Sequence, residues 1–285
     1  MSENIIGKLY LCATPIGNLE DITFRVLKTL KEVDLIAAED TRHSIKLLNH
    51  FQIDTPMTSY HEFNKYDKAK YLVGEMLKGK NIAIITDAGT PGISDPGEEL
   101  VRQCFEAGIQ VSSLPGPAAL ITALTMSGQK TRRFAFEAFL PSEKKERAAV
   151  LEELKNETRT IILYEAPHHL LRTLKELLKT LGDRSITLCK ELTKIHENAN
   201  KTTISSLVDK YTEETPKGEF VLVIEGKTME EKRQEAIDNF LEMSVSEHMD
   251  IYLSKGIDKK EAMKLVAKDR GVSKRDIYNQ LQVTL

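Results

Sequence analysis

The sequence predicts an α/β protein of two domains with mostly parallel sheets and a small C-terminal helical module. Three observations support this fold class. Short apolar runs alternate with stretches of helical period, the alternation restarts after the basic segment 130–133, and only helical patterns follow Gly226. We therefore expect α/β domains at residues 1–118 and 119–227, and the helical module at 228–285.

Length and composition agree with a folded, soluble protein. The 285 residues can form about two domains of ordinary size. Hydrophobic residues make up 41% and charged residues 29%, so disorder is not indicated. No run resembles a membrane span of about 20 apolar residues, and the first residues lack the basic start of a signal peptide. We expect a cytoplasmic protein.

The first domain should contain four strands and three helices. Its apolar runs are too short for helices and end at polar or glycine-rich loops, whereas the stretches between them have helical period. In chain order the expected elements are strand 8–13, helix 19–33, strand 34–39, helix 41–51, strand 81–86, helix 97–108 and strand 109–114. Strands separated by helices favour a parallel sheet.

The second domain should repeat the pattern, and the tail should be helical. Expected strands are 133–140, 159–166, 185–191 and 219–226, and expected helices are 143–156 and 168–181. In the tail, a helix ends at Gly271 and Ser273 caps the next one, as in a helix-turn-helix. Residues 255–285 hold eight Lys and Arg against four acids, which is compatible with a nucleic-acid contact or with a solvated helix pair.

The three cysteines, Cys12, Cys104 and Cys189, lie far apart without a CxxC spacing. This argues against a disulfide framework, a zinc site or a redox pair, and we expect small core residues instead. His168 and His169 are adjacent on an expected helix, where side chains point about 100° apart and do not readily share an ion. We therefore expect no metal.

Two loops with unusual composition follow expected strands: TPIGN at 14–18 and TDAGTPGISDPG at 86–97. Ligands collect at the carboxyl ends of strands in open α/β sheets. Neither loop matches GxxxxGK[ST] or GxGxxG. The longer loop carries Asp87 and Asp95 but no Lys or Arg, so it favours a positively charged ligand such as S-adenosylmethionine; Asp95 could equally cap the following helix.

Seven ordered motifs resemble one known family along most of the chain. The chain is similar to the ribosomal RNA small subunit methyltransferase I family, of the tetrapyrrole methylase superfamily. The motifs are ATPIGNLEDIT, AEDTR, SYHE, TDAGTPGISDPG, PGPAA, YEAPHH and KELTKIHE, between Ala13 and Glu197.

The resemblance implies a tetrapyrrole-methylase-like two-domain fold, a homodimer and S-adenosylmethionine bound between the domains. It implies methylation of a cytidine ribose 2′-hydroxyl in the decoding region of 16S rRNA, in the small ribosomal subunit. The implied cofactor neighbours lie in three loops of the first domain and at one strand end of the second. They are Pro15, Asp87, Ala88, Gly89, Thr90, Pro91, Ser94, Gly116, Pro117, Ala118, Tyr164, Glu165 and Ala166.

One segment departs from the family pattern. After KIHE the family commonly continues with a second acid and an Arg-Gly pair, whereas here the chain has Asn198, Ala199, Asn200, Lys201 and Thr202. Any RNA contact that this stretch makes must therefore differ from the family's.

Polar residues at strand ends are the candidates for catalysis. Transfer to a hydroxyl gains most from correct orientation, and the proton leaves late, so a strong base is helpful but not required. The candidate catalytic residues are Asp40, Arg42, Glu165, Lys190 and Glu191. Alternatives stay open: Asp40 could be a helix N-cap, Arg42 could pair with a surface acid, and Lys190 could pair with Glu191.

Two other functions remain possible. A tetrapyrrole C-methyltransferase would share the fold, but the basic tail and the TPIGN loop argue against it. A non-catalytic RNA-binding assembly factor could keep the same fold. Transfer of a labelled methyl group to ribosomal particles distinguishes these possibilities.

Overall fold

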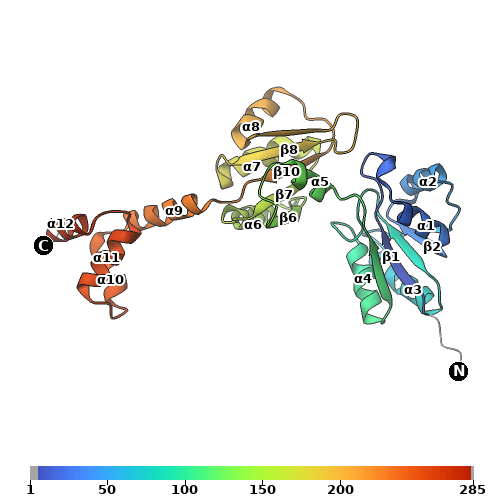
Figure 1. Ribbon diagram of the computed structural model, residues 1–285, viewed down its shortest axis with the longest axis horizontal. Helices are drawn as coiled ribbons and strands as arrows, with labels where there is room; N and C mark the ends of the chain where they lie inside the picture. Colours follow the sequence, from blue (N-terminus) through green and yellow to red (C-terminus); the bar gives the residue numbers. More distant parts are fainter. Residues whose placement is uncertain (1–5, 284–285) are drawn as a thin grey trace. The chain divides into compact units, whose positions relative to one another are not determined.

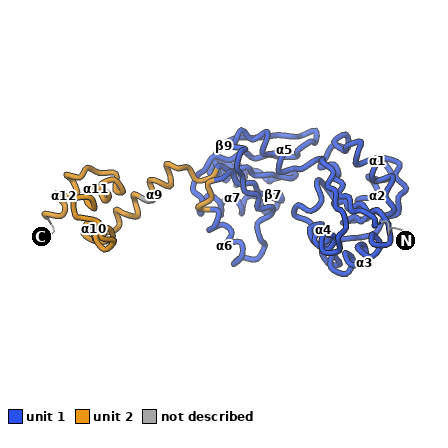
Figure 2. The backbone as a smooth tube through the Cα atoms, turned by 60° about the horizontal axis from the view of Figure 1, so that its bottom comes forward, with its two compact units in different colours: residues 1–154, 159–225 blue, residues 155–158, 226–285 orange. Residues whose placement is uncertain are grey.

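The computed structural model describes residues 6–283 and divides into two compact units (Figure 2). Unit 1 runs up to Leu154 and continues over Arg159–Glu225, and unit 2 comprises Lys155–Thr158 and the chain from Gly226 onward. Unit 1 contains two five-stranded sheets, and unit 2 contains the last four helices. The α/β fold class with a helical C-terminal part is confirmed. The boundaries at residues 118 and 227 stay predictions.

The first sheet, in which Figure 1 labels β1 and β2, is parallel throughout and has the order β3-β2-β4-β1-β5. All four strands that the sequence predicted are present. The three-residue strand β3 is additional, because so short a segment carries no readable period. The strands are β1 (Lys8–Cys12), β2 (Leu35–Ala38), β3 (Met57–Ser59), β4 (Ile82–Ile85) and β5 (Gln110–Leu114).

Helices cover both faces of this sheet. Alternate residues of β4 point to opposite faces: Ile82 and Ile84 pack with α3 and α4, while Ala83 and Ile85 pack with α1 and α2. This explains why all of β4 is apolar. The helical segments are η1 (Leu19–Asp21), α1 (Phe24–Glu32), α2 (Thr41–His50), α3 (Lys65–Leu77) and α4 (Gly97–Glu106).

The second sheet has the order β6-β7-β10-β8-β9 and differs from the parallel arrangement that the sequence predicted. Only β6 and β7 pair in parallel, and the other three pairs are antiparallel. Helices still join strands of equal direction, but β10 lies between β7 and β8 and runs opposite to both. The order of helices and strands along the chain cannot reveal such an insertion. The strands are β6 (Phe134–Ala138), β7 (Thr160–Glu165), β8 (Ser185–Lys190), β9 (Asn198–Thr203) and β10 (Phe220–Ile224).

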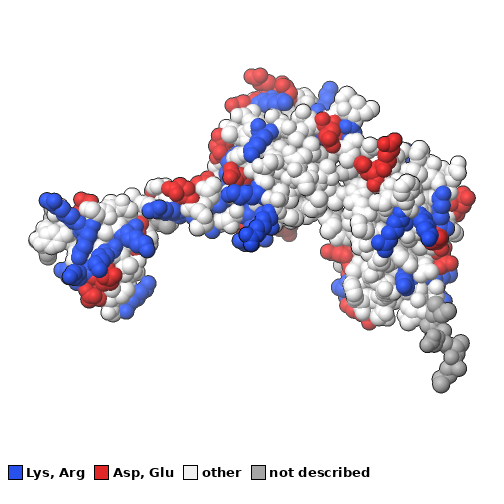
Figure 3. All heavy atoms as spheres, in the orientation of Figure 1, with Lys and Arg blue, Asp and Glu red and all other residues white. Residues whose placement is uncertain are grey.

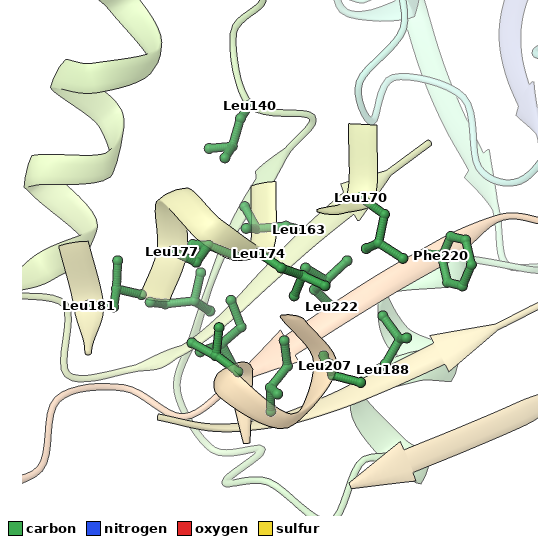
Figure 4. Packing of buried hydrophobic residues seen from close by; sticks show 14 of the residues in the cluster. Leu140, Leu163, Leu170, Leu174, Leu177, Leu181, Leu188, Leu207, Phe220 and Leu222 are labelled. Atoms are coloured by element: carbon green, nitrogen blue, oxygen red, sulfur yellow. The ribbon is translucent and has the colours of Figure 1, made fainter. Parts of the chain in front are cut away.

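A leucine-rich core holds three helices against one face of this sheet. Figure 4 shows Leu170, Leu174 and Leu177 of one helix directed at Leu163 and Leu222 of the strands. The opposite face packs on α5 (Ala119–Met126), which the sequence analysis missed. The helices on the first face are α6 (Lys144–Lys155), α7 (Pro167–Leu181) and α8 (Ile204–Glu213). Pro167 is the first residue of α7, where its missing N–H costs nothing.

Strand β9 was missed because its sequence, NANKTT, has no apolar alternation. It pairs only with β8 and forms the edge of the sheet. Polar residues are usual on an edge strand, where they discourage pairing with another chain. The segment in which the sequence departs from the family pattern is thus regular structure, not a loop.

Unit 2 folds around a small core of its own. Val245, Met249, Val266 and Ile277 are buried together. Ser273 and Asp276 exchange capping hydrogen bonds after Gly271, which has a φ of 65°, so the predicted glycine stop and serine cap are both present. Lys and Arg gather on the face of unit 2 drawn in Figure 3. Its helices are α9 (Met229–Glu242), α10 (Val245–Leu253), α11 (Lys259–Asp269) and α12 (Lys274–Val283).

Cys12, Cys104 and Cys189 are free and buried, as the sequence predicted. Burial raises the pKa of the Cys12 and Cys104 thiols to about 12 and that of Cys189 to about 11. These thiols therefore stay protonated at neutral pH. Within residues 6–283, no helix has the length and apolar character needed to cross a bilayer.

Candidate functional site

Three loops meet at the carboxyl edge of the first sheet because β4, β1 and β5 are neighbours there. Thr14 and Gly89 form an antiparallel bridge with hydrogen bonds of 2.9 and 3.0 Å. The hydroxyl of Thr90 donates to the carbonyl of Pro117 at 2.9 Å. These bonds join the loops after β1, β4 and β5 into one surface.

The twelve-residue loop 86–97 is held in shape from within. The Asp95 carboxylate accepts hydrogen bonds from the backbone N–H groups of Gly92, Ile93 and Gly97, at 2.8 to 3.2 Å. Gly89 has a φ of 86°, a region that favours glycine. A Cβ at position 89 would lie 3.3 Å from Ile16 Cγ2. Asp95 thus fixes the loop, and the glycine lets the loop approach its neighbour closely.

A cavity of about 460 Å³ opens beside these loops, within unit 1. Its volume lies in the range of small-molecule sites. Loops at the edge of the first sheet and strands β7 and β10 of the second sheet contribute to its wall. The lining residues are Ile16, Ala88, Gly89, Thr90, Ile93, Ala118, Ala119, Leu120, Phe139, Tyr164, Glu165, Ala166, Pro167, Leu192, Glu219, Phe220 and Val221.

The charged side chains of this lining are both acidic: Glu165 and Glu219. Glu165 is 6% exposed and accepts hydrogen bonds from the Ala166 N–H, at 2.8 Å, and from the Thr173 hydroxyl. The Tyr164 hydroxyl oxygen accepts the Leu120 N–H at 3.1 Å, and burial raises the Tyr164 pKa. The cavity is therefore apolar, with a negative bias.

Two helices begin at the cavity wall without a side-chain cap. The first residue of α5 is Ala119 and that of α7 is Pro167, and neither helix is capped by the side chain of its N-cap residue. In the first turn of α5, the Leu120 N–H is bonded to the Tyr164 hydroxyl oxygen. The first N–H groups of a helix attract anions. The cavity thus combines carboxylates with uncapped helix starts.

Comparisons with known proteins agree on one family. The family model described as Tetrapyrrole (Corrin/Porphyrin) Methylases matches residues 8–208. The Ribosomal RNA small subunit methyltransferase I of Synechocystis sp. is 48% identical over 98% of this chain and 99% of its own length. The protein of the same name from Bacillus subtilis is 46% identical over 98% and 95%. The chain belongs to the ribosomal RNA small subunit methyltransferase I family.

Solved structures agree on the fold. A uroporphyrin-III-C-methyltransferase from Thermus thermophilus has a TM-score of 0.54 at 18% identity, over 76% of this chain and 94% of its own. A diphthine synthase has a TM-score of 0.61 at 12% identity, over 77% and 90%. At this identity the likeness concerns the fold alone.

Seven of the thirteen cofactor residues that the family resemblance implied line the cavity: Ala88, Gly89, Thr90, Ala118, Tyr164, Glu165 and Ala166. The other six do not line it: Pro15, Asp87, Pro91, Ser94, Gly116 and Pro117. They belong to the same three loops. Gly116 packs against the first loop so closely that a Cβ would lie 2.6 Å from that of Ala13.

Asp40 and Arg42 lie outside the cavity lining and bind one another. Asp40 is the N-cap of α2 and accepts the Arg42 N–H at 2.8 Å. The Arg42 guanidinium donates to both Asp40 oxygens, at 2.8 and 3.1 Å. These bonds hold the pKa of Asp40 well below its usual range. Both structural alternatives that the sequence left open are thus present, and neither excludes a functional role.

Asp87 connects this pair with the twelve-residue loop. Its Oδ1 accepts the Asp40 N–H at 3.2 Å. Burial, and then the nearby charge of Glu39, raises the Asp87 pKa. The side chain therefore lies in a negative region beside the cavity residue Ala88.

Lys190 and Glu191 do not pair with each other. Glu191 has a φ of 51° and accepts the Glu219 N–H at 2.9 Å, and that bond lowers its pKa. Its ion pair is with Lys194, at 3.1 Å. Lys190 lies in a separate basic hollow. Of the five candidate catalytic residues, only Glu165 lines the cavity.

The sequence analysis missed ten lining residues, most of them apolar. Ile16 and Ile93 lie inside the quoted motifs and were passed over because only small or polar positions were selected. Phe220 and Val221 belong to β10, whose insertion brings them to the cavity. Ala119, Pro167 and Leu192 also lie within quoted motifs, and membership of a motif was the signal that could have identified them.

His168 and His169 are both exposed and do not line the cavity. Across the described residues, no three His, Cys, Asp or Glu side chains are grouped so that they could hold a metal ion.

Proposed function

We propose that this protein transfers the methyl group of S-adenosylmethionine to the 2′-hydroxyl of a cytidine in the decoding region of 16S rRNA. The proposed substrate is the rRNA in the small ribosomal subunit, and the proposed assembly is a homodimer. The observation that carries the proposal is a small-molecule cavity whose lining has two carboxylates and no Lys or Arg, in a member of this family.

The residues present fit the proposed donor. S-adenosylmethionine carries a sulfonium and an ammonium but no phosphate, so a negative lining attracts it. Glu165 supplies that field, whereas the Glu219 carboxylate is paired with Lys194 at 2.9 Å. The uncapped start of α5 at Ala119 would hold the donor's carboxylate. Apolar residues such as Leu120 and Val221 would cover the adenine.

When bound, the donor supplies a methyl group activated by the sulfonium. The chain's own contribution is to orient the ribose hydroxyl for in-line attack and to exclude water. Orientation alone can lower a barrier by about 7 to 11 kcal/mol in favourable cases. The rigid loops around Thr14, Gly89 and Pro117 are suited to this task. The backbone bonds between Thr14 and Gly89, and the bond from the Thr90 hydroxyl to the Pro117 carbonyl, fix the wall.

Among the candidate catalytic residues, we assign Glu165 a positioning role at the cavity. Both of its oxygens already accept hydrogen bonds, from Ala166 and Thr173, so the carboxylate is held in one orientation. Asp40, Arg42, Lys190 and Glu191 would position the RNA around the reacting nucleotide. The ribose proton leaves late in the reaction, so no buried base is required.

The test is transfer of a labelled methyl group from S-adenosylmethionine to purified small ribosomal subunits. We expect label in 16S rRNA, in a cytidine that resists alkaline cleavage on its 3′ side, since the 2′-hydroxyl is blocked. Label on a base, or transfer only to a uroporphyrinogen-type ring, contradicts the proposal. Donor binding without any transfer would favour the assembly-factor alternative.

Donor binding can be tested separately by calorimetry on Asp87→Asn. The amide oxygen can still accept the Asp40 N–H, so the variant mainly removes charge. We expect weaker binding by about tenfold, which corresponds to about 1.4 kcal/mol. The matched control is Asp54→Asn, an exposed carboxylate outside the cavity lining. Unchanged affinity in Asp87→Asn contradicts the electrostatic argument for the donor.

A further inference from the structure

A basic hollow of about 360 Å³ lies at the outer edge of the second sheet. It is formed by the end of β8, the start of β9, the end of α8 and the loop that follows α8. The sequence analysis named Lys190 as a candidate catalytic residue but gave no role to residues 198–202, which contribute Asn198 and Asn200. Its lining residues are Leu188, Lys190, His196, Asn198, Asn200, Lys210, Tyr211, Glu214, Thr215 and Lys217.

The strand register explains why these side chains lie together. Lys190 is paired with Asn198, and Leu188 with Asn200, across antiparallel strands. Because side chains alternate between the faces of a strand, these four point to one side. Ala199 and Lys201 point to the other side, where Ala199 packs in the α5 core and Lys201 donates to the Gly128 carbonyl.

The hollow has an excess of positive charge. Three lysines and one glutamate line it, which leaves a surplus of two positive charges at neutral pH. Lys210 lies 3.9 Å from Glu214, at the limit of an ion pair. Lys190 and Lys217 form no ion pair with any residue that the structure describes. Two ammonium groups are thus available to an outside anion.

Neutral groups in the hollow are also available. Asn198 and Asn200 are exposed, and their side-chain amides make no hydrogen bond within residues 6–283. Tyr211 is 8% exposed, forms part of the wall and lies under the Lys210 ammonium, 5.5 Å from the ring centre. Amides can read base edges or ribose hydroxyls, whereas lysines bind phosphates as point charges.

The hollow is connected with the candidate donor cavity along one short segment. Leu192 lines the donor cavity, Thr193–His196 line a neighbouring groove with Gly17–Glu20 and His50, and His196 lines both that groove and the basic hollow. Asn198 lies six positions after Leu192, and an extended chain of that length spans at most about 20 Å. A polymer bound at the donor cavity can therefore reach the hollow.

We propose that the basic hollow binds the phosphodiester backbone of the RNA substrate next to the reacting nucleotide. Lys190, Lys210 and Lys217 contact phosphates, and the amides of Asn198 and Asn200 contact a base edge or a ribose. This inference rests on the proposed function, which makes RNA the substrate. The proposal gives a role to the polar strand β9, which stands where the family commonly has an Arg-Gly pair.

The test compares Lys210→Gln/Lys217→Gln with the wild type in binding a short fluorescent single-stranded RNA at several salt concentrations. The logarithm of the RNA association constant falls linearly with the logarithm of the salt concentration, and each contacted phosphate contributes about 0.7 to 1 to the steepness of that line. We expect the slope of the double variant to be smaller by about 1.4 to 2, with weaker binding for every RNA sequence. Its calorimetric affinity for S-adenosylmethionine should be unchanged, which shows that the fold is intact.

Two further variants control for net charge and separate the polar contacts. Lys175→Gln/Lys179→Gln removes the same charge from exposed positions of α7 outside the hollow and should keep the wild-type slope. Asn198→Ala/Asn200→Ala should also keep the slope but change the ranking of RNA sequences. Equal slope losses in the two lysine pairs, or no loss in Lys210→Gln/Lys217→Gln, overturn the proposal.

Competitors decide which anion the hollow takes. Inorganic phosphate should compete with RNA for the same lysines. An acidic peptide that binds the wild type but not Lys210→Gln/Lys217→Gln, in the absence of any lysine-dependent RNA binding, would show a site for another anion and overturn the inference. Methyl transfer by the wild type is scored independently. Lysine-dependent RNA binding without transfer would refute the proposed function and leave this inference standing, whereas transfer without lysine dependence would do the reverse.

Discussion

The backbones of Thr14 and Gly89 are joined by two hydrogen bonds, of 2.9 and 3.0 Å, although β1 and β4 precede them in separate parts of the chain. This short antiparallel bridge stands at the edge of an otherwise parallel sheet. It fixes the distance between two loops that contribute to the cavity wall. The site is therefore sensitive to changes in backbone freedom at Gly89.

Gly89→Ala should weaken donor binding. Alanine at a φ of 86° costs about 1 to 2 kcal/mol, and its Cβ would lie 3.3 Å from Ile16 Cγ2 inside the cavity wall. We expect at least tenfold weaker binding of S-adenosylmethionine in calorimetry. Gly108→Ala is the control, since Gly108 has a φ of 69° but no atom within 4 Å of its added Cβ. Equal donor affinity in Gly89→Ala and Gly108→Ala would count against this cavity.

Gly17→Ala should disturb the cavity from its other side. The new Cβ would lie 2.8 Å from Thr193 Oγ1 and 3.1 Å from the Leu192 carbonyl oxygen. Moving this turn shifts Leu192, which lines the cavity, and weakens the bond from the Asn18 N–H to Thr193. We expect reduced methyl transfer and reduced donor affinity.

The control for that change is Gly74→Ala in helix α3, where no atom lies within 4 Å of the added Cβ. A helical glycine replaced by alanine gains about 0.5 to 1 kcal/mol of stability. Thermal unfolding should therefore shift upward in Gly74→Ala, with activity unchanged. A Gly17→Ala enzyme with wild-type donor affinity would show that the 192–194 turn does not shape the site.

The three thiols should be unreactive in the folded protein. Burial keeps each thiol protonated, and the thiolate is the reactive form. A thiol-specific chromogenic reagent at pH 8 should label none of the cysteines in the native chain and all three after denaturation. Rapid labelling of the native protein would contradict the buried positions of Cys12, Cys104 and Cys189.

Unit 2 should lose stability as the solution becomes acidic, because of His248. This side chain is 0% exposed, stacks on Phe240 and accepts the Arg270 Nε–H at Nδ1, at 3.2 Å. Its Nε2 lies 3.3 Å from Asp269 Oδ2, and Asp269 also accepts the Tyr252 hydroxyl. Burial, and then the Arg270 charge, lowers the His248 pKa from 6.5.

Folding lowers the pH at which His248 binds a proton. The unfolded chain takes up a proton near pH 6.5, whereas folded His248 does so only at lower pH, so the free energy of unfolding falls as the pH decreases below about 6.5. The protection factors of the α10 and α11 amides against hydrogen exchange should fall over this range. His248→Gln should remove most of that fall. An unchanged pH dependence in the variant would assign the effect to another group.

The sequence predicted the first sheet well because the chain there alternates strand and helix, and a crossover helix imposes parallel strands. The loop motifs also pointed to the edge of that sheet beside which the cavity lies, since carboxyl ends of parallel strands share one edge. The positions of Gly89, Thr90 and Ala118 beside a cavity therefore follow from their motifs. The apolar lining, such as Leu192 and Val221, could not be predicted, because an apolar residue in a strand or turn looks the same whether it faces a core or a ligand.

By itself the sequence determined the alternating elements, the buried cysteines, the capped helices of the tail and the family, since each is recorded in local pattern or in residue identity. Only the tertiary structure decided the position of β10 between β7 and β8, the edge strand β9, and which polar groups pair. Those features depend on contacts between segments far apart in the chain. Hydrophobic periodicity and motif spacing indicate which face of a segment is apolar, but not which other segment packs against that face.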